Sequence, residues 1–167
     1  RIKLRRGIYD PEILEQRIGI PVLASIAFSP AQKRIAKQFK KQPRTPVLPL
    51  AAQAPSDPAS ESIRSLRTSL HFLMLEASSK LLLVTGPTPG AGKSFVAVNL
   101  AVMLAQSGRS VLLIDGDMRR GHIHRMLGVR PETGLCDYLT GQYEPAVVRL
   151  DALAHDLPLP GRGPPNN

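Results

Sequence analysis

The stretch "LLLVTGPTPGAGKSFVAVNLAVMLAQSGRSVLLIDGDMRR", residues 81–120, decides the fold. It opens with a short apolar run, Leu81 to Thr85, which is followed by a glycine-rich turn. Residues 94–106 are rich in apolar side chains and end at a Ser-Gly stop, which predicts a helix. A second apolar run, Ser110 to Ile114, then ends in Asp-Gly-Asp. The order strand, turn, helix, strand predicts two buried parallel strands joined by a helix.

The glycine-rich turn has the composition of a phosphate-binding loop. Backbone N–H groups of residues 88–94 are expected to point at phosphate oxygens, and the following helix adds the positive end of its dipole. Gly90 and Gly92 let the backbone approach a ligand closely because they carry no Cβ. Lys93 is expected to reach the β- and γ-phosphates of a nucleotide, and Ser94 to hold Mg²⁺ through its hydroxyl.

The turn departs from the strict phosphate-loop pattern at one position. G-x-x-x-x-G-K-[ST] requires glycine at position 87, where the chain has Pro87, with Gly86 one place earlier. A chance strand–turn–helix with a surface lysine is the alternative, but the structural context favours the loop. The predicted fold class is therefore α/β, a P-loop NTPase with a mostly parallel sheet flanked by helices. The residues predicted to bind ATP are Thr88, Pro89, Gly90, Ala91, Gly92, Lys93, Ser94 and Phe95.

Two carboxylates follow the second apolar run. Asp115 and Asp117 stand at the carboxyl end of a predicted strand, where α/β sheets bind ligands, and share a side if the strand continues. One is expected to hold Mg²⁺ and the other to accept a proton from an attacking hydroxyl, although the residues leave the two roles exchangeable. An acid pair that merely caps the next helix is the alternative. The predicted catalytic residues are Lys93, Asp115 and Asp117, and the predicted magnesium ligands are Ser94, Asp115 and Asp117.

Composition excludes several protein classes. The chain has 167 residues and one cysteine, so it has no internal disulfide. It contains no apolar run of the length, about 20 residues, that a membrane-spanning helix needs. The net charge of +9 gathers in two basic clusters, within residues 1–6 and 33–44. Such clusters predict proximity to an anionic membrane surface, with plain solvated charge and nucleic acid as alternatives. Nucleic-acid-binding modules usually add aromatic side chains that stack on bases, and Phe39 is the one aromatic residue within the second cluster, so we expect no nucleic-acid partner.

The chain divides into three predicted regions. Residues 1–41 form a basic segment with a helix from Asp10-Pro11-Glu12 to about Arg17 and a strand at Ile20–Phe28. Residues 42–60 hold five prolines without periodicity and predict a disordered or extended linker. Residues 61–167 form the N-terminal part of the P-loop domain. This part should begin with a helix capped by Ser60 or Ser62, and should contain short helices at 122–127 and 134–141. The apolar face predicted for the first helix consists of Ile63, Leu66, Leu70, Leu73 and Met74.

Several motifs and segments carry a family resemblance. "GPTPGAGKS" followed by "VLLIDGDMR" resembles the two Walker motifs of the bacterial tyrosine kinases of capsule and exopolysaccharide synthesis. "ESIRSLR" matches the E-x-x-R-x-x-R signature that this family carries just upstream, and "DPEILEQRIGIPVLASI" resembles its juxtamembrane stretch. "RPETGLCDYLTG" and "GRGPPNN" stand where the family has similar segments. The resemblance runs in order over nearly the whole chain except the linker.

The resemblance implies a tyrosine autokinase domain that transfers the γ-phosphoryl of ATP to tyrosine with Mg²⁺ and regulates polysaccharide synthesis and export. It implies a location at the cytoplasmic side of the bacterial inner membrane, beside a membrane-spanning polysaccharide co-polymerase region, fused or separate. It further implies a cognate tyrosine phosphatase and ring-like self-association through Glu61, Arg64 and Arg67. The family also carries a later Walker B aspartate and a tyrosine-rich tail, which this sequence lacks, so we expect a C-terminally truncated piece.

Two other functions stay open. A partitioning-type ATPase, which transfers phosphoryl to water, resembles this class closely but carries a signature lysine in the glycine turn, where this chain has Thr88. A non-catalytic fragment that self-associates as a scaffold of polysaccharide export is the other possibility, favoured by the missing Walker B aspartate.

Overall fold

The computed structural model describes residues 10–41, 49–119, 121–127 and 135–141. Within these residues the regular structure is helical, and none of these helices is long and apolar enough to cross a membrane. The helices are α1 (Pro11–Ile18), α2 (Pro30–Lys41), α3 (Leu50–Gln53), α4 (Pro58–Leu75), α5 (Lys93–Gln106), α6 (Ile123–Met126) and α7 (Leu135–Leu139).

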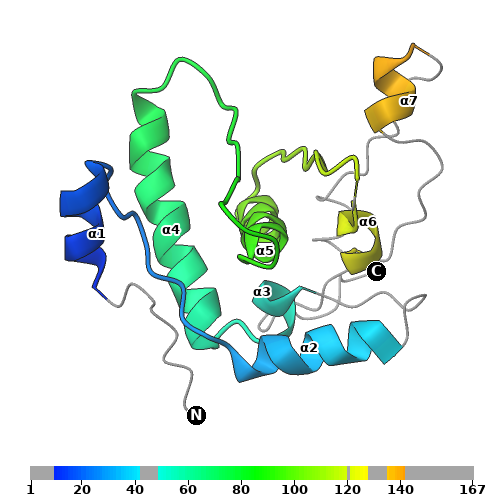
Figure 1. Cartoon of the computed structure of the whole chain (residues 1–167), viewed down its shortest axis with the longest axis horizontal. Coiled ribbons are helices and arrows are strands. Elements are labelled where there is room, and N and C mark those ends of the chain that lie inside the picture. The colour runs from blue at the N-terminus through cyan, green and yellow to red at the C-terminus, as the bar shows by residue number, and fades with distance from the viewer. Residues whose placement is uncertain (1–9, 42–48, 120, 128–134, 142–167) are drawn as a thin grey trace, which may run out of the picture.

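The core lies where α3 and α4 pack against α5 (Figure 1). It is built by Ala51, Ile63, Leu100, Val102 and Met103. The predicted apolar face of α4 is confirmed along most of its length: Ile63 is fully buried and Leu70 packs against this core, whereas Leu73 is exposed. Since α5 is apolar on nearly every side, it is the central helix, and the other elements surround it.

The predicted helix start at Asp10 is confirmed. The Asp10 carboxylate accepts a hydrogen bond from the Glu12 N–H, and Pro11 occupies the first turn, where its missing N–H costs nothing. The helix ends at Gly19, whose positive φ of 65° suits a residue without a Cβ. The short helices predicted at 122–127 and 134–141 are also present, as α6 and α7.

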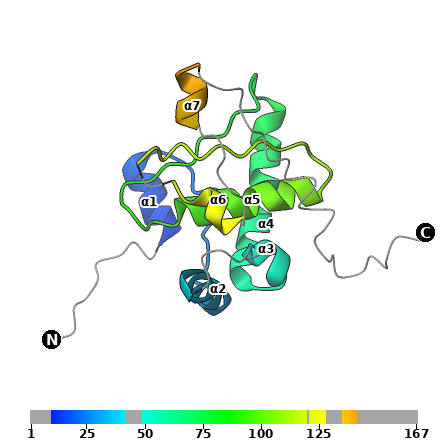
Figure 2. The ribbon, with the colours of Figure 1, turned by 90° about the vertical axis from the view of Figure 1, so that its right-hand side faces the viewer.

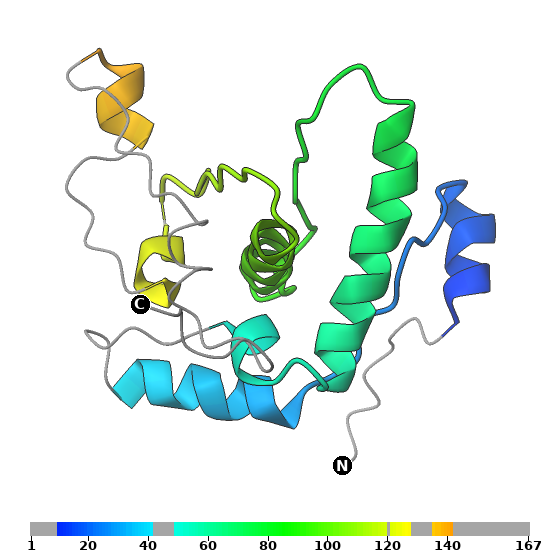
Figure 3. The same ribbon diagram turned by 180° about the vertical axis from the view of Figure 1, so that it is seen from behind.

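The strand predicted at Ile20–Phe28 is wrong. This segment forms no ladder; it runs along α4, as Figures 1 and 3 show. The Ala27 N–H donates to the Ser62 hydroxyl, and the Ser69 hydroxyl donates to the Leu23 carbonyl. Hydrogen-bonding groups of an extended chain are thus partly satisfied by serines of a neighbouring helix instead of by a second strand.

The prediction of a disordered or extended linker is wrong for residues 49–60; residues 42–48 lie outside the described part. Leu50 is fully buried in the short helix α3, and Pro58 opens α4 instead of interrupting a helix. The turn between them is tied by the Ser60 hydroxyl, which donates to the Ala54 carbonyl. Proline and alanine gave no periodic signal here, yet Pro58 fits the first turn of α4 and Ala51 packs within the short helix α3.

The runs predicted as parallel strands are extended but are not paired as strands within the described residues. In the first run Leu81 and Leu83 are 89% and 86% exposed. In the second, Leu112 and Ile114 are exposed, whereas Val111 and Leu113 pack against Ala101 and Ala105 of α5. A buried parallel strand needs strands beside it and cover on both faces, and two candidate strands are too few to provide them.

Candidate nucleotide-binding site

The glycine-rich turn forms a compact loop that leads directly into α5. Gly90 and Gly92 have φ of 77° and 91°, the left-handed region that glycine adopts without strain. Gly92 is the N-cap of α5, and no side chain caps this helix start. The loop is closed by hydrogen bonds from the Ala91 N–H to the Thr88 carbonyl and from the Val96 N–H to the Gly92 carbonyl. The two glycines thus allow the left-handed backbone of the loop, and their close approach to a phosphate stays a prediction.

Lys93 folds back across this loop. Its ammonium donates to the Thr88 carbonyl at 3.2 Å, and its side chain passes close to Gly86, where an added Cβ would lie 3.3 Å from the lysine Cδ and Cγ. The glycine displaced by one place from the strict pattern therefore lies against the lysine stem. A loop with two left-handed glycines, a lysine held over it and an uncapped helix start suits the phosphates of a nucleotide.

Asp115 is engaged by backbone N–H groups. Its Oδ2 accepts from the N–H groups of His122 and Ile123 at 2.8 and 3.0 Å, and its Oδ1 accepts from the Asp117 N–H. The carboxylate thereby caps the start of α6. Helix capping is the structural role that the sequence offers as the alternative to a catalytic one. Position 121 in this turn leaves little room for a side chain, because a Cβ on Gly121 would lie 3.0 Å from the Asp117 carbonyl and 3.2 Å from Asp115 Oδ2.

Asp117 lies in an exposed turn after Asp115. Its Oδ1 accepts from the Arg119 N–H at 3.2 Å, which closes a turn of the kind that aspartate favours. The hydrogen bonds of the predicted site thus fall into two groups, one around Lys93 in the loop and one around Asp115. Each group confirms a local turn; their roles toward nucleotide and Mg²⁺ stay predictions.

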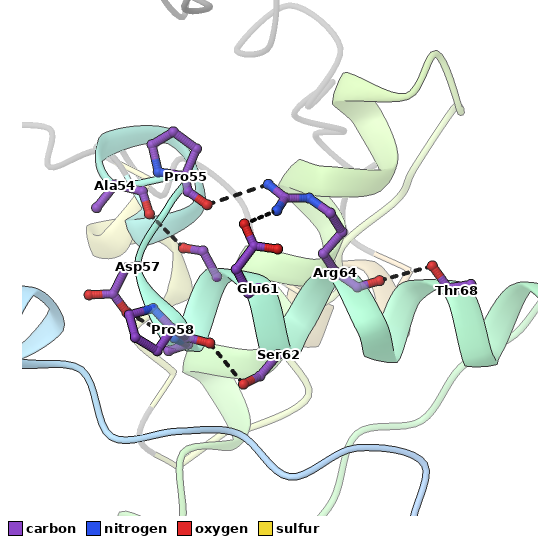
Figure 4. Close-up of polar contacts among 10 residues, drawn as sticks. Ala54, Pro55, Asp57, Pro58, Glu61, Ser62, Arg64 and Thr68 are labelled. Carbon is purple, nitrogen blue, oxygen red and sulfur yellow. Dashed lines mark hydrogen bonds and ion pairs between the residues drawn. The ribbon is translucent and has the colours of Figure 1, made fainter.

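The E-x-x-R-x-x-R motif lies on α4, and Figure 4 shows its first two charged residues, Glu61 and Arg64. Glu61 and Arg64 form an ion pair one helical turn apart, and Arg64 also donates to the Pro55 carbonyl at 3.4 Å. Arg67 instead donates to the Met103 carbonyl of α5, so it ties two core helices together. Glu61 and Arg64 remain partly exposed, whereas Arg67 has an intramolecular structural role that its spacing did not indicate.

Two positions that matter for the structure, Gly121 and Asn99, were not identified from the sequence. Gly121 has no pattern that marks it, because its importance arises from a contact with a carboxylate six residues earlier. Asn99 is a buried polar residue inside α5; it accepts from the Ala51 N–H and donates to the Phe95 carbonyl. A polar residue within an otherwise apolar helix was the available signal.

Comparison with known proteins relates these features to a family. A ParA family model, described as an iron-transfer P-loop NTPase (NUBPL), matches residues 77–154. A putative tyrosine-protein kinase in the cps region of Klebsiella pneumoniae is 44% identical over 164 residues, which is 96% of this chain and 22% of the relative. The tyrosine-protein kinase etk of Escherichia coli K12 is 42% identical over 176 residues, covering 99% of this chain and 24% of that protein.

Solved structures agree with the sequences. The BceF tyrosine kinase domain is 42% identical and superposes with a TM-score of 0.74 over 83% of this chain and 55% of that chain. The kinase domain of Escherichia coli ETK is 41% identical, with a TM-score of 0.71 over 83% of this chain and 54% of that chain. The chain belongs to the bacterial tyrosine kinase family. The predicted family and the P-loop NTPase fold are therefore confirmed.

The bacterial tyrosine kinase relatives are much longer than the matched part. The chain spans less than a quarter of the curated relatives and about half of the solved kinase domains. The kinase domains therefore contain further residues that have no counterpart in this chain.

Proposed function

We propose that this chain is the nucleotide-binding part of a protein-tyrosine autokinase, which transfers the γ-phosphoryl of ATP to a tyrosine hydroxyl. The observation that supports it best is the loop in which Lys93 crosses over the left-handed glycines at the start of α5. The relatives that share this stretch at 41–44% identity carry the words tyrosine kinase in their names.

The residues fit a magnesium nucleotide. Loop N–H groups and the Lys93 ammonium would bind phosphate oxygens, and the hydroxyl of Ser94 would hold Mg²⁺ with Asp117. Bound Mg²⁺ neutralises charge on the phosphates during transfer. Asp115 is the weaker candidate for the base, since both its oxygens accept hydrogen bonds from backbone N–H groups; as a cap it would fix the turn that carries Asp117.

The family context also suggests the location and partners of the whole protein. We place the whole protein at the cytoplasmic side of the inner membrane, beside a polysaccharide co-polymerase region and opposed by a cognate tyrosine phosphatase. Glu61 and the partly exposed Arg64 would contact a neighbouring subunit in a ring, and Arg67 would support them by holding α4 on α5.

The partitioning-type ATPase stays the second candidate, because the matching family model is of the ParA group. Its signature lysine would stand at Thr88, whose carbonyl here receives the Lys93 ammonium instead. The two functions differ in the acceptor, which is tyrosine in one and water in the other.

Titration calorimetry with ATP and Mg²⁺ tests the nucleotide site. We expect Lys93→Ala to weaken binding by about tenfold or more, because it removes a charged donor to phosphate. Lys80→Ala removes an exposed lysine outside the loop and should bind as the parent chain does. Equal affinities of all three proteins would contradict the site. Phosphotyrosine on a longer protein that binds ATP would then distinguish the kinase from the ATPase.

A further inference from the structure

Helix α2 carries a stripe of cations. Its sequence, PAQKRIAKQFKK, contains no acidic residue. Lys33, Lys37 and Lys41 recur every four residues, so they follow one side of the helix, with Arg34 beside them. All four side chains are exposed. From Lys33 to Lys41 the stripe is about 12 Å long, given the rise of an α-helix.

The opposite side of α2 is occupied by the protein itself. Ala31, Gln32 and Ile35 are half-buried, and α2 packs against α3. Figures 1 and 2 show α2 along one edge of the molecule, beyond α3. Since this apolar side is already covered, the cationic stripe is the side presented to the surroundings.

A polar bridge holds α2 in this orientation. The Ser29 hydroxyl accepts from the Gln32 N–H at the start of α2 and donates to Asp57 Oδ2 at 2.8 Å. Asp57 Oδ1 in turn accepts from the Ala59 N–H and caps α4. The starts of the two helices are therefore linked through one carboxylate, and α2 is held firmly on the body of the protein.

The cations of the stripe have no carboxylate partner in the described part of the chain, where the ion pair found is Glu61–Arg64. Four like charges on one helix face repel one another, and an external anionic surface would relieve that repulsion. The sequence adds a second cluster before α1, formed by Arg1, Lys3, Arg5 and Arg6.

We propose that the stripe of Lys33, Arg34, Lys37 and Lys41 is a docking face for the anionic headgroups of a lipid bilayer. Binding to an anionic bilayer requires only that several basic side chains face the same way along a surface. Basic residues are attracted to an anionic leaflet when they lie within about a Debye length of it. Single-stranded nucleic acid is bound by cations interleaved with several aromatic side chains, whereas α2 contains a single aromatic residue, Phe39. The proposal rests on charge and orientation, so it is independent of the kinase reaction.

Sedimentation of the 167-residue chain with lipid vesicles tests this docking face. Vesicles of phosphatidylcholine are compared with vesicles that also contain phosphatidylglycerol. Each basic residue near an anionic surface contributes about fivefold to binding, so Lys33→Gln with Lys37→Gln should bind roughly twenty-five-fold more weakly. Glutamine and lysine have similar helix propensities, so α2 should persist in this variant.

Two control variants make the test specific. Lys80→Gln with Arg109→Gln removes the same charge from exposed positions outside α2 and should bind nearly as the parent chain does. Lys33→Arg with Lys37→Arg keeps the charge and should retain binding. The proposal is overturned if the glutamine variants of α2 and of the control positions lose binding equally, or if neutral vesicles bind as well. It is also overturned if a single-stranded oligonucleotide displaces the chain from anionic vesicles while the α2 variant binds that oligonucleotide more weakly.

Discussion

Helices α4 and α5 and the first extended run, Leu81 to Thr85, all contain large apolar side chains but bury them very differently. Ile63 and Val98 are fully buried between helices, whereas Leu81 and Leu83 are almost fully exposed. A helix satisfies its own backbone and needs one packed face, but a strand satisfies its backbone only through neighbours. Helical parts of a sheet fold can therefore pack within this stretch, while strand parts depend on residues further away.

The largest expected effect tests this contrast directly. Ile63→Ala removes a buried side chain from the core and should lower the free energy of unfolding by about 2–5 kcal/mol. Leu83→Ala, at an exposed position, should change it by less than about 0.5 kcal/mol. Chemical denaturation followed by circular dichroism measures both.

A different ranking of these two stability losses would contradict the contrast between the buried helices and the exposed run. If Leu83→Ala cost as much as Ile63→Ala, the first apolar run would have to be packed in solution, against a sheet or a second copy of the chain. If both were neutral, the helical core itself would be absent.

Elements with local signals were predicted well from the sequence. Asp10, Pro11 and Gly19 mark the two ends of α1, and the glycine turn indicated where α5 begins. Each of these signals acts within a few residues, so no knowledge of the rest of the fold was needed.

Elements that depend on distant partners were predicted poorly. Leu50 is buried in α3, which packs against α5 more than forty positions later in the chain, and composition alone suggested a linker. The same limit applies at the site: the loop around Lys93 was predicted from spacing, but the cap that Asp115 forms depends on how the chain turns at Gly121.

The next effect concerns a polar contact inside the helical part. Asn99→Ala leaves the buried N–H of Ala51 without its acceptor and should cost about 1–3 kcal/mol in the free energy of unfolding. Gln106→Ala, a half-buried polar position on the same helix, should cost clearly less. A neutral Asn99→Ala, measured by the same denaturation, would show that α3 is not held on α5 and that the linker prediction was right after all.

The smallest effect compares two helix caps of the same type. Asp10 and Asp57 each accept a hydrogen bond from the second residue of a helix that opens with proline. Loss of such a cap costs about 1 kcal/mol. Asp57→Ala should reach at least this value, because it also removes the acceptor of the Ser29 hydroxyl, whereas α1 buries no residue and can fray without disturbing the core.

Asp10→Ala should therefore leave the global unfolding midpoint nearly unchanged, while Asp57→Ala lowers it. Ser29→Ala completes a double-mutant cycle with Asp57→Ala, and the two losses should be less than additive because both remove the same hydrogen bond. Strict additivity would mean that Ser29 and Asp57 act separately. The starts of α2 and α4 would then not be linked, and the orientation of the cationic stripe would depend on the packing of α2 against α3.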